Sequence, residues 1–248
     1  MRVLIYMVTG LSALVCYMFF RARITEFLVH DISFFENNLS KRLLFISDLH
    51  KRKVSKKDIK RVGNVDLILI GGDITEKAAD NGTLLDNLKT LTAKAPVYFV
   101  WGNNDYGKRK KLQEYLVLYN VNQLNNRNVT FEEEGWSLAG VEDLNFHFHN
   151  MNEALNGAVN PTLLLCHDPE IIKESNRYTN IKLILSGHTH GGQIRIGKFS
   201  PAPKGSLKKY QDITHLTSNG YGTTRLPLRL GAPPQIHVIN LVNVSKQR

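Results

Sequence analysis

The chain has little cysteine: only Cys16 and Cys166 occur among its 248 residues. Two cysteines cannot build a disulfide framework, so a small disulfide-stabilised domain is excluded. We expect both thiols to stay free, which suits a reducing compartment. Internal repeats and low-complexity segments are also absent. The length is ample for a single packed core in one large domain or two small ones.

Acidic residues are outnumbered, with 22 Asp and Glu against 32 Lys and Arg, which leaves a formal net charge of +10. Such a surplus is compatible with binding to nucleic acid, anionic lipid or a phosphorylated substrate, and it does not distinguish among these partners. Single-strand binders interleave stacking aromatics with their cations. The basic run at residues 51–61 is poor in aromatics. We therefore predict a solvated helix face there, with a basic lip over a phosphate site as the alternative, and regard nucleic acid as an unfavoured partner.

One long run lacks charge altogether, from Val3 to Phe20, with arginines on both sides of it. At about 1.5 Å per residue it would form a helix about 27 Å long, close to the hydrocarbon thickness of about 30 Å. A secretory signal peptide is the competing interpretation, but it needs a shorter apolar core and small residues at its cleavage site. Bulky residues at 17–20 do not provide one. We predict an uncleaved, single-pass transmembrane anchor over residues 1–23.

The orientation of the anchor is predicted from the basic residues near its ends. Arg2 and the amino terminus lie on one side, and Arg21, Arg23, Lys41 and Arg42 lie on the other. The positive-inside rule then favours a domain in the cytoplasm, held against the cell membrane. An exported domain is the alternative. Beyond the anchor we expect a connector with an edge strand at residues 24–41 and one domain at residues 42–248.

The domain alternates between apolar strands and amphipathic segments, which indicates a layered α/β fold. Apolar residues at helical spacing predict helices over residues 81–93 and 108–119. Consecutive strands at 128–131 and 136–141 have no helix between them, so a second sheet is expected to begin there. Strands are also predicted at 213–218 and 236–242, and a loop at 198–209. The sequence therefore predicts two packed sheets with helices outside.

Five apolar strands stop at polar clusters. Asp48 and His50 follow the run at 43–47, and Asp73 follows the run at 66–70. Asn103, Asn104 and Asp105 follow the run at 96–101. His167 follows the run at 162–166, and His188 and His190 follow the run at 181–185. Near-continuous apolar strands are buried on both faces of a sheet. Open α/β sheets bind ligands at the carboxyl ends of their strands, and neutral imidazole is the commonest metal ligand. The pattern predicts a metal centre at that edge.

In this order, over about residues 42–193, the motifs resemble those of the calcineurin-like metallophosphoesterase superfamily. The Gly-His-Thr-His-Gly-Gly-Gln stretch at 187–193 and the segment 219–229 resemble a bacterial, often membrane-anchored branch that includes UDP-2,3-diacylglucosamine pyrophosphatase-like enzymes. The resemblance implies a four-layer α-β-β-α sandwich. It also implies hydrolysis of phosphodiester or pyrophosphate bonds by a metal-bound hydroxide at the membrane surface.

The resemblance further implies a dinuclear centre. One metal would be held by Asp48, His50 and His190, the other by Asn103, His167 and His188, with Asp73 as the bridge. Oxygen and imidazole donors without thiolate suit Mn²⁺, Fe²⁺ or Zn²⁺, and we expect two divalent ions, with Mn²⁺ favoured. A carboxylate bridge would hold two cations close enough to activate one water and clamp a phosphoryl oxygen.

Asn104 departs from the family pattern, in which many relatives have histidine. An amide donates a hydrogen bond but cannot supply a proton at neutral pH. The change favours diesters or pyrophosphates, lipid- or nucleotide-linked, over monoesters. Asp73, Asn104 and Asp105 are the catalytic candidates, and Asp105 either orients a ligand or caps a helix.

Several alternatives remain open at this stage. They are a phosphomonoesterase or nuclease of the same fold, and a non-catalytic binding module. Arg225 and Arg229 are expected to be solvated loop residues, with phosphate recognition as the alternative. His147 and His149 match nothing in the signature and are not expected to be ligands. His30 precedes every motif and is expected to be surface or structural.

Overall fold

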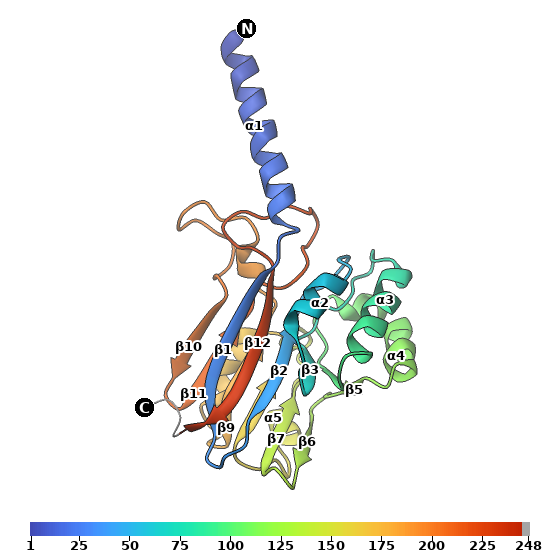
Figure 1. Cartoon of the computed structure of the whole chain (residues 1–248), viewed down its shortest axis with the longest axis vertical. Coiled ribbons are helices and arrows are strands. Elements are labelled where there is room, and N and C mark those ends of the chain that lie inside the picture. The colour runs from blue at the N-terminus through green and yellow to red at the C-terminus, as the bar shows by residue number, and fades with distance from the viewer. Residues whose placement is uncertain (245–248) are drawn as a thin grey trace.

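The computed structural model describes residues 1–244, which form two six-stranded sheets packed face to face and one projecting helix, α1 (Figure 1). The first sheet has the order β1-β12-β2-β3-β4-β5. Its strands are β1 (Glu26–Phe35), β12 (Gln235–Asn243), β2 (Lys41–Ile46), β3 (Leu67–Ile70), β4 (Val97–Phe99) and β5 (Asn122–Gln123). Strands β2 to β5 are mutually parallel, so their carboxyl ends share one edge. The edge strand expected before the first core strand is β1, which confirms that expectation.

The second sheet has the order β10-β11-β9-β8-β7-β6. Its strands are β10 (Ser206–Tyr210), β11 (Ile213–Thr217), β9 (Ile181–Ser186), β8 (Thr162–Leu165), β7 (Trp136–Gly140) and β6 (Arg127–Phe131). Its inner pairs are parallel and its two outermost pairs are antiparallel. The predicted loop at 198–209 is partly wrong, because residues 206–210 form β10. This strand is mostly exposed and has no apolar face that would have revealed it.

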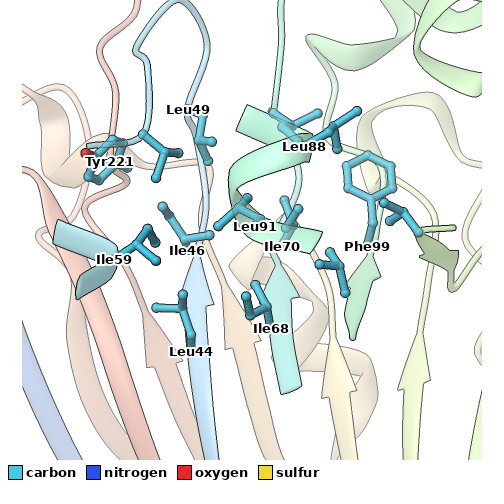
Figure 2. Packing of buried hydrophobic residues seen from close by; sticks show 14 of the residues in the cluster. Leu44, Ile46, Leu49, Ile59, Ile68, Ile70, Leu88, Leu91, Phe99 and Tyr221 are labelled. Carbon is cyan, nitrogen blue, oxygen red and sulfur yellow. The ribbon is translucent and has the colours of Figure 1, made fainter. Parts of the chain in front are cut away.

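Alternating side chains on each strand build three apolar layers. Leu43 and Phe45 of β2 lie between the two sheets, whereas Leu44 and Ile46 face the helices α2 (Lys56–Val62), α3 (Asn81–Thr92) and α4 (Arg109–Leu118) (Figure 2). The outer face of the second sheet is covered by α5 (Met151–Ala154) and α6 (Ile172–Ser175). Short 3₁₀ turns complete the fold at Asp105–Lys108, Leu144–Phe146, Pro169–Ile171 and His190–Gly192. The predicted four-layer α/β sandwich is confirmed.

Helix α1 (Arg2–Arg21) is long and apolar enough to cross a membrane, with a mean hydropathy of 2.1 and only 6% of its apolar window buried. Such low burial sets it apart from a core helix. Its last turn alone meets the domain: Met18 and Ala22 are buried, and the Arg229 amide donates to the Met18 carbonyl at 3.1 Å. The helix is therefore a candidate membrane span by length and composition.

Strand directions place α1 beside the ligand-bearing edge. Strand β1 starts just after α1 and runs away from it, parallel to β12, and β12 is antiparallel to β2. Strand β2 therefore runs toward α1, and so do β3 and β4. The carboxyl ends of these strands lie at the end of the sandwich from which α1 projects (Figure 1).

Candidate metal centre

The loops after β2 and β9 bring together the first expected ligand group. Donor atoms of Asp48, His50 and His190 all lie within 4.8 Å of one another, and all three residues are buried. The Nε2 atoms of His50 and His190 are 3.0 Å apart, and His190 Nε2 lies 3.4 Å from Asp48 Oδ1. Three donors that converge so closely can share one cation.

The second expected group gathers beside the first. His188 Nδ1 lies 3.0 Å from Asn103 Oδ1 and 3.1 Å from His167 Nε2. Asp73 lies between the groups, because its Oδ2 is 3.4 Å from His167 Nε2 and 3.7 Å from His50 Nε2. The structure thus brings together all seven residues that the sequence singled out as ligands, in the groupings that the resemblance implied.

Backbone strain is concentrated at this centre. Five of the seven side chains belong to non-glycine residues with positive φ: Asp48 (54°), His50 (52°), Asp73 (52°), His188 (69°) and His190 (49°). Each such residue costs of order 1–3 kcal/mol, so strain of this kind persists only where the surrounding structure enforces it. The left-handed geometry turns these side chains inward from the strand ends, and its clustering marks a functional site.

Glycines between the ligands let the loops approach each other. A Cβ on Gly72 would lie 2.6 Å from His167 Nδ1, and one on Gly102 would lie 2.3 Å from Asp73 Oδ1. A Cβ on Gly187 would lie 2.4 Å from Asp48 Oδ2. No real Cβ tolerates such distances, so only glycine fits at these positions. The glycines in the motifs are therefore part of the packing that holds the donors.

The protonation preferences suit a cation site. Burial works against a charge on Asp73, but His167, His50 and the Asn104 amide together hold its pKa below the ordinary value. Burial lowers the pKa of His190 to about 3, which keeps its imidazole neutral and able to bind metal. Burial also opposes protonation of His50, yet nearby carboxylates, Glu76 first, raise its pKa. Carboxylates crowded around imidazoles in this way favour a bound positive charge.

Two supporting contacts fix the orientation of the histidines. His167 Nδ1 lies 2.8 Å from the Gly71 carbonyl. Since a carbonyl only accepts, Nδ1 carries a proton and Nε2 faces the centre. His50 Nδ1 lies 3.1 Å from Glu76 Oε2, and Lys51 lies 2.8 Å from the other oxygen of that carboxylate. The His50 contact lowers the pKa of Glu76 to about 2. Sequence reasoning missed Glu76, whose only signal is its place three residues after Asp73.

Asp105 and Asn104 both act on Asp73. The fully buried Asp105 carboxylate accepts hydrogen bonds from the amides of Asp73 (2.8 Å), Thr75 (3.0 Å) and Gly102 (2.9 Å). These contacts fix the backbone around Asp73, and the role of Asp105 in orienting a ligand stays a prediction. Asn104 donates to Asp73 twice, from its backbone amide at 2.8 Å and from its side chain at 2.7 Å.

Arg229 is fully buried, so the expectation of a solvated loop arginine is wrong for this residue. Its guanidinium donates to five backbone carbonyls, those of His190 (3.0 Å), Ala232 (2.8 Å), Asn219 (2.7 Å), Gly220 (3.4 Å) and Gly222 (2.6 Å). Burial lowers its pKa to about 9, which still leaves it cationic at neutral pH. These contacts fix the His190 backbone and the loop after β11.

The centre opens into a pocket of about 300 Å³, lined by Asp73, Asn103, Asn104, His188, Thr189, His190, Gly192, Gln193, Pro201, Ala202 and Thr224. A neighbouring hollow of about 520 Å³ is lined by Ala78, Asn104 and Thr224, by the cations Lys51, Lys77 and Arg225, and by Glu76. Glu76 pairs with Lys51 at 2.8 Å, so the cations exceed the acids in this lining by two. Arg225 is exposed there, as expected of a loop residue. A phosphate group in the pocket would therefore meet positive charge on its outer side.

The remaining candidates lie outside the centre. Cys166 is free and fully buried, and burial raises the pKa of its thiol well above the ordinary value, so it cannot serve as a nucleophile. His147 is exposed, and His149 lies 3.3 Å from Glu174. His30 is half-buried and contacts His237 at 3.1 Å, a structural role.

The family model for calcineurin-like phosphoesterases matches residues 41–192, which is more than half of the chain. The chain belongs to this family. Members are hydrolytic phosphoesterases with a dinuclear metal site, and the Asp and His groups described above could bind metal. The fold is also that of TT1561 of Thermus thermophilus, with a TM-score of 0.51 at 12% identity over 73% of this chain and 90% of that one.

Three relatives of this phosphoesterase are informative. It is 40% identical to Bacillus subtilis YpbG over 207 residues, 80% of each chain. It is 28% identical to the Escherichia coli phosphodiesterase YaeI, over 88% of each chain. It is 30% identical to a bovine transmembrane protein with a metallophosphoesterase domain, over 79% of this chain and 52% of that protein. The resemblance to the UDP-2,3-diacylglucosamine pyrophosphatase-like branch stays a prediction.

Proposed function

We propose that this phosphoesterase hydrolyses phosphodiester or pyrophosphate bonds with two divalent cations, at a membrane surface. The observation that carries the proposal is the convergence of two donor groups on either side of Asp73, in a buried and strained setting. A non-catalytic binding module would have no reason to maintain such a costly arrangement. The similarity to a protein named a phosphodiesterase supports the choice of reaction.

The residues that would hold the cations follow from their positions. Asp48, His50 and His190 would bind one, Asn103, His167 and His188 the other, and Asp73 would bridge them. The donor chemistry suits Mn²⁺, Fe²⁺ or Zn²⁺, and we propose Mn²⁺ as the favoured ion. When bound, the cations would lower the pKa of a water and offset negative charge on the phosphoryl oxygens. Asp105 and Glu76 would keep Asp73 and His50 in place for this chemistry.

The composition of the pocket favours substrates with good leaving groups. Among the residues that line it, the titratable side chains are Asp73, His188 and His190, all of them proposed ligands. The others carry amides, hydroxyls or apolar groups, and the Asn104 amide is already directed at Asp73. The pocket therefore offers no spare acid to protonate a poor leaving group. This supports diesters and pyrophosphates over monoesters.

An anchor formed by α1 would hold the site at a bilayer. Helix α1 supports membrane attachment by its length and apolar surface, and so does the similarity to a protein named as transmembrane. Of the two orientations, the basic residues beyond the helix favour a cytoplasmic domain. A lipid- or nucleotide-linked phosphoester would be the substrate.

The test compares the full-length protein with Asp73→Asn in detergent, supplied with Mn²⁺. We expect the wild type to hydrolyse bis-p-nitrophenyl phosphate at least about 10-fold faster than p-nitrophenyl phosphate. Asp73→Asn should lose diesterase activity and bound metal, measured by elemental analysis, with an unchanged unfolding temperature. Asp212→Asn, an exposed carboxylate at the β10–β11 turn, is the matched control. An Asp73→Asn variant as active as wild type would refute the dinuclear proposal.

A further inference from the structure

Two loops border the pocket, at residues 193–205 and 222–231, and we call them the mouth loops. Among the residues that the structure describes, three large apolar side chains on them are strongly exposed: Ile196 (69%), Phe199 (71%) and Leu226 (60%). Isolated exposed apolar residues are normal on a protein surface. Three of them on adjoining loops beside a site need an explanation, because a group of apolar side chains exposed to water often marks an interaction surface.

The mouth loops are fastened to each other at the pocket. The Arg195 amide donates to the Leu230 carbonyl at 2.8 Å, and the Leu230 amide donates to the Gln193 carbonyl at 3.0 Å. The Gln193 side chain accepts from the Thr224 amide at 2.9 Å and donates to the Leu226 carbonyl at 3.1 Å. Since Gln193 and Thr224 line the pocket, the exposed side chains are held in a fixed relation to its opening.

The mouth loops are also fastened to the membrane helix. The Arg229 amide binds the Met18 carbonyl in the last turn of α1, and the Arg229 side chain binds the His190 carbonyl at the centre. Both mouth loops lie around the base of α1 (Figure 1). If α1 spans a bilayer, its last turn marks the membrane–water interface, and the mouth loops lie at that level.

Charge on the mouth loops matches an anionic surface. Neither 193–205 nor 222–231 contains aspartate or glutamate. Lys198, Lys204 and Arg225 are exposed on them. Each cation near an anionic leaflet contributes about 1 kcal/mol of attraction. Apolar side chains interleaved with cations, as at Ile196, Lys198 and Phe199, are typical of segments that lie in a membrane interface.

We propose that the mouth loops rest in an anionic bilayer, with Ile196, Phe199 and Leu226 inserted among the headgroups. The pocket then opens directly onto the bilayer surface, and the substrate is a lipid phosphodiester or pyrophosphate that is hydrolysed without leaving the membrane. The inference rests on the proposed function, because it takes α1 as a membrane span and the centre as a hydrolase. It goes beyond that function by fixing the bilayer as the binding partner of these loops.

Tryptophan fluorescence tests the insertion independently of activity. The native Trp101 and Trp136 are buried, which leaves a new exposed tryptophan distinguishable after subtraction of the wild-type signal. The full-length Phe199→Trp and Leu226→Trp variants are reconstituted in vesicles of phosphatidylglycerol with either plain or brominated phosphatidylcholine. We expect the brominated lipid to quench both by about half or more, and to leave Val117→Trp, equally exposed on α4, unquenched. Quenching of Phe199→Trp no stronger than that of Val117→Trp would overturn the insertion.

Paired substrates test the lipid specificity. Phosphatidyl-p-nitrophenol in the vesicles and soluble bis-p-nitrophenyl phosphate are both diesters with the same leaving group. The double variant Phe199→Ser/Leu226→Ser should hydrolyse the lipid about 10-fold more slowly than wild type and the soluble diester within 2-fold of it. Equal rates for variant and wild type on the lipid, or equal losses on both substrates, would contradict the inference. Failure of the wild type on the soluble diester would instead refute the proposed function, whatever the quenching shows.

Discussion

Replacing Arg229 with methionine should destabilise the domain severely, although the residue lies in a loop. Methionine keeps an unbranched apolar chain but removes the guanidinium, which leaves the carbonyls of Asn219, Gly222 and Ala232 without this donor. The His190 carbonyl still accepts from the Gln193 amide at 3.0 Å. An unsatisfied buried acceptor costs about 1–3 kcal/mol. At the lower figure, because water can reach part of the vacated space, three carbonyls cost about 3 kcal/mol. This is a large part of a typical total stability of about 5–15 kcal/mol.

Thermal unfolding of the full-length protein in detergent measures this loss. For a domain of this size, 1 kcal/mol lowers the unfolding temperature by about 2–4 °C, so Arg229→Met should lower it by about 6–12 °C. Arg225→Met, in the same loop but exposed, should stay within about 2 °C of wild type. Arg229→Lys should fall between, since an ammonium has fewer and less spread donors. If Arg229→Met unfolds at the wild-type temperature, the buried guanidinium does not hold this loop.

Three further changes have distinct expected results. Gly187→Ala places a Cβ against the Asp48 carboxylate and should weaken metal retention about 10–100-fold, measured by titration with a chelator, and wild-type retention would contradict the packing argument. Asn104→His supplies an acid at the pocket and should raise the ratio of monoesterase to diesterase kcat/KM at least about 10-fold, whereas an unchanged ratio would show that this position does not decide the leaving group. Burial is the main cause that lowers the pKa of His215 to about 4 and that of His237 to about 3. Because both values lie below the unfolded value of about 6.5, the two neutral histidines stabilise the fold fully above that pH, and this stabilisation is lost as the pH falls below it. Urea midpoints should therefore show a loss of about 2 kcal/mol per histidine between pH 7 and pH 5 that His215→Gln/His237→Gln does not share.

The sequence predicted the centre because each proposed ligand follows a strand that is easily identified from its apolar residues. Continuous apolar runs such as those before Asp48 and Asp73 cannot be mistaken for solvent-exposed segments. Parallel strands carry their carboxyl ends to one edge, so ligands far apart in the chain could be expected to meet. The glycines of the motifs pointed to close backbone approach, and the structure places them within clashing distance of the ligands. The domain boundaries and the role of each ligand stay predictions.

Contacts that arise only from tertiary packing could not be predicted from the sequence in this way. In the sequence, Arg229 looks like an ordinary loop residue. Its acceptors, at 190, 219, 220, 222 and 232, lie on separate segments, and no local sequence pattern indicates that these segments come together. Nothing in the sequence distinguishes Glu76 from the other acidic residues, because its contact with His50 forms only when β3 and β2 bring the two residues together. Strand β10 shows no alternation because it is an exposed edge, so only its pairing with β11 defines it.

The position of β12 has a consequence for biogenesis. This strand lies between β1 and β2, so Leu43 pairs with Ile239 although the two residues come from opposite ends of the chain. The first sheet cannot close until β12 has been synthesised, and β12 follows every other described strand in the chain. Helix α1 precedes every described strand, so it is synthesised before this sheet can close. If α1 is a membrane span, it would be available to a bilayer while the fold beside it is still incomplete.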